Sequence, residues 1–112
     1  MSWLSSRLQM PVTVPDLSAS GYRFMGGSLV ATVHGPAGML MYDNGHGIRL
    51  VMFMRPMGVD KDVHTMVPSA NGAVAGFSWS NNGIGYSLVG AVAPEILHPI
   101  ANQVRAQVSS GI

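Results

Sequence analysis

The chain has 112 residues, a formal net charge of +1 and only 10% charged side chains, well below the usual quarter. This length predicts one domain that can bury a core without metal or disulfides. The six basic residues are scattered, which argues against nucleic acid as a partner, and the absence of cysteine excludes disulfides and zinc–thiolate sites.

The N-terminal third predicts a short helix followed by an interrupted strand. Ser2–Gln9 can form a helix with Ser2 as its N-cap, and two prolines then prevent its continuation. We expect a turn over Asp16–Ser20 and a strand over Gly21–Val33. The Gly26-Gly27 pair inside this strand predicts a bulge or a tight turn.

A first hairpin is predicted from Met39–Asp43 and Ile48–Arg55, around the loop Asn44–Gly47. A loop of two or four residues places one set of alternating side chains on the core face, whereas a loop of three residues would turn one strand over. With an even loop, the core face carries Met39, Met41, Ile48, Leu50, Met52 and Met54.

The opposite face of this hairpin mixes apolar and basic side chains and is expected to be partly exposed. Apolar centres with an arginine rim are common at protein interfaces. The sequence therefore predicts a partner surface made of Leu40, Tyr42, Arg49, Val51, Phe53 and Arg55. The alternative is that the chain ends or the long loops cover this face.

The region after the first hairpin divides into a loop and a second hairpin. Pro56–Asn71 predicts mostly loop, with at most a short strand around Val63–Val67. Gly72–Val92 predicts two strands around Asn82-Gly83, which suits the positive φ angles of a type I′ turn. This two-residue loop would place Trp79 opposite Tyr86 on an apolar face.

Ala93–Ser109 predicts an amphipathic helix. Pro99 either kinks this helix or marks its start. The apolar stripe at helical spacing consists of Ile96, Leu97, Ile100, Val104 and Val108. Helices on one face of an antiparallel sheet of about five strands give an α+β fold.

Residues suited to catalysis or metal binding are sparse. The five carboxylates form no obvious pair, and no nucleophile-elbow motif occurs, so we expect no enzyme. His34, His46, His64 and His98 lack metal-ligand spacing, and core packing explains four of the nine methionines, so we expect no metal and no cofactor. Thioether and imidazole groups do suit copper, which leaves a stand-alone soluble copper-binding or metal-sensing protein as the alternative.

Several short groups occur in a characteristic order along the chain. They are Trp3-Leu4-Ser5 with Arg7-Leu8, Pro11-Val12, Pro15-Asp16-Leu17, Gly21-Tyr22-Arg23, Gly26-Gly27, Met41-Tyr42, Gly47-Ile48-Arg49-Leu50, Trp79 and Gly83–Gly90. Together with the terminal helix, this set resembles the periplasmic C-terminal domain of transmembrane anti-sigma factors. Proteins of that family regulate extracytoplasmic-function sigma factors.

The resemblance implies a three-part protein with a cytoplasmic helical domain, one transmembrane helix and a domain like this one. Residues 1–112 would then be a single domain, the excised sensory piece, tethered before Trp3 on the periplasmic side of the bacterial inner membrane. Its expected role is signal sensing and interaction, through a protein partner or self-association. The sigma factor would be reached only through the missing cytoplasmic domain, and the resemblance supplies no catalytic residue.

Overall fold

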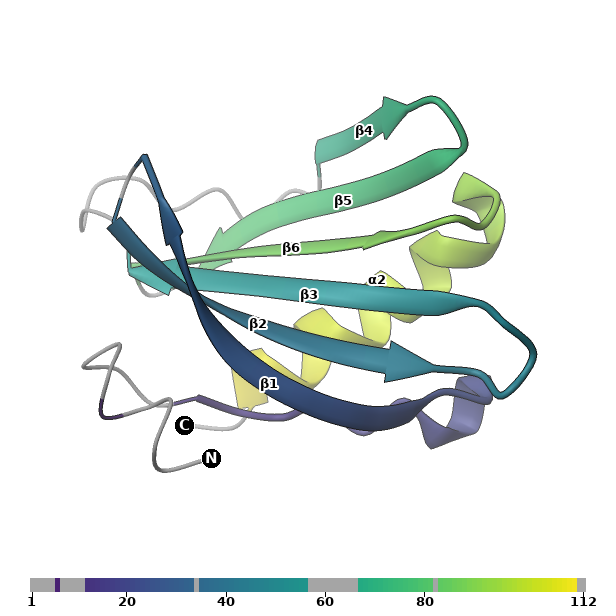
Figure 1. Cartoon of the computed structure of the whole chain (residues 1–112), viewed down its shortest axis with the longest axis horizontal. Coiled ribbons are helices and arrows are strands. Elements are labelled where there is room, and N and C mark those ends of the chain that lie inside the picture. Colours follow the sequence, from purple (N-terminus) through teal and green to yellow (C-terminus); the bar gives the residue numbers. More distant parts are fainter. Residues whose placement is uncertain (1–5, 7–11, 34, 57–66, 82, 111–112) are drawn as a thin grey trace.

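Six antiparallel strands and one long helix make up most of the described part of the chain (Figure 1). The computed structural model describes residue 6 and the ranges 12–33, 35–56, 67–81 and 83–110, with the side chains of 109 and 110 excepted. In chain order, the elements are the 3-10 helix η1 (Ser18–Ser20), β1 (Arg23–Thr32), β2 (Gly35–Asp43), β3 (Arg49–Pro56), β4 (Val67–Asn71), β5 (Val74–Asn81), β6 (Ile84–Gly90) and α2 (Pro94–Ser110).

The strands form one sheet in the order β1-β2-β3-β6-β5-β4. This confirms the predicted α+β fold, with six strands rather than about five. The additional strand is β4 (Val67–Asn71). Of the short strand expected around Val63–Val67, residues 63–66 lie outside the described part of the chain. The predicted helix over Ser2–Gln9 lies outside the described residues, apart from Ser6, which is helical.

The hairpin of β5 and β6 has the predicted register. Asn81 pairs with Ile84 and Trp79 pairs with Tyr86, as a two-residue loop requires. The rings of Trp79 and Tyr86 stack with their centroids 5.5 Å apart and an interplanar angle of 22°. Gly83 has a φ of 77°, which is the left-handed conformation that the turn was expected to need.

The hairpin of β2 and β3 differs from the prediction in one decisive respect. Asp43 pairs with Arg49, so the loop contains five residues, 44–48, and an odd loop turns one strand over. The loop is built by side-chain caps, because the Asn44 Oδ1 accepts hydrogen bonds from the backbone N–H groups of His46 at 2.8 Å and Ile48 at 3.1 Å. Gly45 supplies left-handed backbone, with a φ of 78°.

As a consequence, the faces of β2 are exchanged relative to the prediction. Leu40 and Tyr42 lie in the core, with 0% and 1% of their surface exposed, so the expectation that they are partly exposed is wrong. Met39 and Met41 were predicted to lie in the core, but they lie on the opposite face of the sheet. Met52 and Met54 are buried as predicted.

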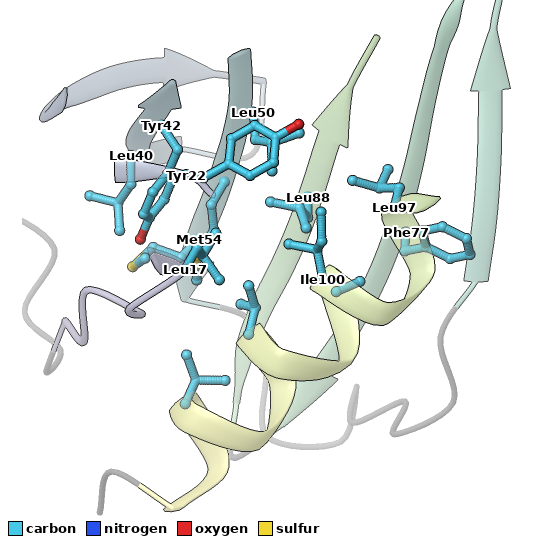
Figure 2. Close-up of a cluster of buried hydrophobic side chains, with 14 of the residues drawn as sticks. Leu17, Tyr22, Leu40, Tyr42, Leu50, Met54, Phe77, Leu88, Leu97 and Ile100 are labelled. Carbon is cyan, nitrogen blue, oxygen red and sulfur yellow. The ribbon is translucent and has the colours of Figure 1, made fainter. Parts of the chain in front are cut away.

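Helix α2 packs across β5 and β6 and closes the core (Figures 1 and 2). Leu97 and Ile100 point from the helix toward the sheet. Ile96 was predicted to belong to the buried stripe, but 58% of its surface is exposed. The helix begins at Pro94, so Pro99 lies inside it rather than at its start. The buried side chains of the helix are Leu97, Ile100, Ala101, Val104 and Val108.

The segment before η1 is fastened between α2 and the sheet. The side chain of Gln107 makes two hydrogen bonds with the backbone of Asp16. Its Oε1 accepts from the Asp16 N–H at 2.7 Å, and its Nε2 donates to the Asp16 carbonyl at 2.8 Å. Pro15 and Leu17 on either side are buried. The Tyr42 hydroxyl donates to the Pro15 carbonyl at 2.8 Å, in a buried position. This segment is therefore an integral part of the core.

Tyr42→Phe should lower the free energy of unfolding by about 1–2 kcal/mol, because it leaves the buried Pro15 carbonyl without its hydrogen-bond donor. Burial raises the pKa of the Tyr42 phenol, so this donor stays protonated above the pH at which an exposed tyrosine ionises. Urea denaturation of the variant measures the loss. A variant as stable as the wild type would show that the segment does not depend on this bond.

Candidate interaction surface

The face of the sheet opposite α2 carries an apolar centre contributed by three neighbouring strands. We call this side of the sheet the outer face. Its side chains follow from the strand register and from the alternation of neighbours along a strand. In the central part of this face they are Met39 and Met41 of β2, Val51, Phe53 and Arg55 of β3, Ser87 and Val89 of β6, and Ser78 of β5, beside Gly76.

Two rows of side chains run across the outer face, one for each level of the register. In the first row, Met41 pairs with Val51, and Val51 pairs with Val89. In the second row, Phe53 lies between Met39 and Ser87. The apolar side chains of both rows are half-buried. The outer face therefore changes from apolar over β2 and β3 to small and polar over β5.

Charged groups border the apolar centre at both ends of β3. At the loop end, the Arg49 Nε lies 3.3 Å from the Asp43 Oδ2, and the Arg49 side chain is 64% exposed. The backbone N–H of Gly45 lowers the pKa of the Asp43 carboxyl, with Arg49 and Arg23 contributing in the same direction. Arg55 lies near the other end, on the same face as Phe53. The border is thus mainly basic.

The residues predicted to form a partner surface are divided between the two faces of the sheet. Val51, Phe53 and Arg55 share the outer face, and Arg49 lies at its border. Leu40 and Tyr42 are excluded by burial, and Met39 and Met41 take their places. The signal that could have located the two methionines is the run Asp43-Asn44-Gly45 with Gly47. Its two Asx caps and two glycines suit a loop longer than a two-residue turn.

The described methionines of β2 and β3 are divided between the two faces of the sheet. Met52 and Met54 are in the core beneath the sheet, whereas Met39 and Met41 are on the outer face. Within the described ranges, no three His, Asp or Glu side chains gather as metal ligands would. His46 is exposed in the β2–β3 loop, whereas the ring of His98 on α2 lies 5.0 Å from that of Phe77. His34 and His64 lie outside the described residues.

Comparison with known proteins finds solved structures of similar fold. No family model and no curated protein sequence matches the chain. Among solved structures, MucB in complex with MucA(peri) superposes on 72% of this chain with a TM-score of 0.58 and 18% identity. The MucA/MucB complex of Pseudomonas aeruginosa gives 0.59, again over 72% of this chain at 18% identity. The fold is similar to part of MucB.

The likeness to MucB concerns only a portion of that protein. The chain matches 31% of the length of MucB in the first structure and 30% in the second. At this identity, the likeness is one of fold. In the parts of the chain that the structure describes, no helix has the length and apolar character needed to cross a membrane.

Proposed function

We propose that this chain is a periplasmic interaction domain of a system that regulates an extracytoplasmic-function sigma factor through an anti-sigma factor. The observation that carries the proposal is the MucB-like fold, which was solved in MucB bound to MucA(peri). The collinear groups that resemble transmembrane anti-sigma factors support the finer assignment, that the domain is the sensory part of such an anti-sigma factor.

Several of the positions that carry the resemblance are buried in the core of this fold. Leu17, Tyr42, Leu50, Trp79 and Leu88 are all buried members of the core. A shared core explains why short groups spread along the chain keep their order and spacing in proteins of similar fold. The resemblance therefore includes core positions before η1 and in β2, β3, β5 and β6, rather than one local motif.

The outer face is the surface that we assign to the protein partner. Its apolar centre is accessible enough to lose water on contact, and its arginines can pair with acidic groups on a partner. The domain would act by changing what this surface binds and would not catalyse a reaction. A signal at the surface would then reach the sigma factor through the tethered remainder of the protein.

Phe53→Asp with Arg55→Glu, placed in the full-length protein, should change sigma-dependent transcription several-fold in a reporter strain. The double change puts two acidic groups on the outer face, and these would repel the acidic groups of the partner. Replacing Phe53 by aspartate also removes the aromatic side chain that would anchor the partner. The matched control is Ile96→Asp on α2, which adds one acidic group at an exposed position on the other side of the sheet. It should leave transcription unchanged.

Two results would count against different parts of the proposal. Wild-type transcription from a folded and inserted double variant would exclude the outer face as the partner surface. Removal of the whole domain tests the function itself. If sigma-dependent transcription then stayed at its wild-type level, the regulatory role would be wrong.

A further inference from the structure

The two edge strands of the sheet differ in how well they are protected against pairing with another strand. β4 is only five residues long and carries Pro68, two features that limit edge pairing. β1 is ten residues long and contains no proline and only one charged residue, Arg23 at its start. Its one irregularity, at Met25, lies near that end and leaves Gly26–Thr32 in regular pairing with β2. Among the described residues, β1 pairs with β2 alone, so its other edge ends the sheet.

The sequence of β1 is complementary to itself around Ser28. Two glycines precede this residue, Gly26 and Gly27, and two branched apolar residues follow it, Leu29 and Val30. In an antiparallel pair centred on Ser28, Leu29 of one strand lies opposite Gly27 of the other, and Val30 lies opposite Gly26. Each large side chain would then meet a residue that has none.

The faces of the strand agree with this pairing. Gly27 and Leu29 lie opposite Leu40 and Gly38 on the core side of the sheet, and Leu29 packs against the core. Gly26 and Val30 lie on the outer face with Ser28. Around Gly26 there is room for an incoming side chain, because no heavy atom lies within 4 Å of the position that a Cβ would take.

We propose that two copies of this chain associate through β1, antiparallel, with a two-fold axis at Ser28. The two sheets would join into one continuous sheet, and backbone groups at the edge of each copy would be paired by the other. A second copy is favoured over a foreign strand because the small and large residues that complement each other are both in β1 itself. Association through this edge leaves the outer face of the proposed function available, so the two proposals can fail independently.

The first test uses the fact that Ser28 would face its own copy across the axis. Sedimentation of the purified domain across the micromolar range should show a monomer–dimer equilibrium for the wild type. Ser28→Lys and Ser28→Glu should each be monomeric, because like charges opposite each other in a strand pair are destabilising. An equimolar mixture of the two variants should restore the dimer. Ser69→Lys on the exposed part of β4 is the matched control and should dimerise like the wild type.

The second test is a crosslink, which the absence of native cysteine makes specific. Residues opposite each other in an antiparallel pair have Cα atoms about 4.5–5.5 Å apart, within the range of a disulfide. Under mild oxidation, Ser28→Cys should therefore form a covalent dimer much faster than Ser69→Cys. Equal crosslinking rates would overturn the proposal.

Two further outcomes would also overturn it. One is a wild-type domain that is monomeric at all concentrations. This outcome includes the case in which the β1 amides gain protection from hydrogen exchange only after a partner protein is added, since β1 would then pair with that protein and not with a second copy. The other is a dimer that Ser28→Lys leaves intact.

Discussion

Replacing Ile100 by alanine should lower the free energy of unfolding by about 2–4 kcal/mol, the usual cost of lost burial plus the cavity that remains. Ile100 is only 4% exposed and points from α2 toward the sheet (Figure 2). Its neighbours on the helix, Leu97 and Ala101, are completely buried, so little rearrangement can fill the space. Urea or guanidinium denaturation measures the change.

The same helix provides a matched control for this prediction. Ile96 has the same side chain, lies four residues earlier and is 58% exposed. Ile96→Ala should therefore change stability by less than about 0.5 kcal/mol. A loss below about 1 kcal/mol for Ile100→Ala would mean that α2 is not docked on β5 and β6 as described.

Adding a single methyl group at Gly90 should destabilise the protein by about 1–3 kcal/mol through overpacking. Gly90 pairs with Leu50 across β6 and β3, and a Cβ on Gly90 would collide with the Leu50 Cδ2 atom. Leu50 is completely buried, so its side chain has little freedom to move away. Denaturation of Gly90→Ala measures the cost.

A double-mutant cycle tests the mechanism behind this prediction. Leu50→Ala alone should cost about 2–5 kcal/mol by opening a cavity. In Gly90→Ala with Leu50→Ala, the new methyl group occupies part of that cavity and no longer collides. The double variant should therefore lose clearly less stability than the sum of the two single changes. Strict additivity would show that Gly90 and Leu50 are not in contact.

The outer face shows how one local feature can decide which side chains share a surface. Val51, Phe53 and Arg55 could be assigned to one face of β3 from alternation alone. Which side chains of β2 join them depends on whether the intervening loop is even or odd. The five-residue loop, with its caps on Asn44 and Asp43, places Met39 and Met41 beside them. Which residues of one strand share a face follows from the alternation of its side chains. Which residues of the next strand join them depends on the number of residues in the turn.

Features governed by short-range chemistry could be predicted from the sequence. The hairpin around Asn82-Gly83, its Trp79–Tyr86 pair and the docked face of the C-terminal helix follow from turn preference and periodicity. The α+β class follows from the order of these elements. Each of these depends on residues close together in the chain, so the pattern contains the necessary information.

Other features were decided only by tertiary contacts. Val67–Asn71 contains a proline and has little preference for strand structure, yet it is a strand because it pairs with β5. Ile96 has helical spacing but is exposed, because the sheet lies against the neighbouring face of α2. The adjacency of β3 and β6, which joins the hairpins into one sheet, brings together residues far apart in sequence. Such contacts depend on how apolar faces meet in space, which local patterns do not specify.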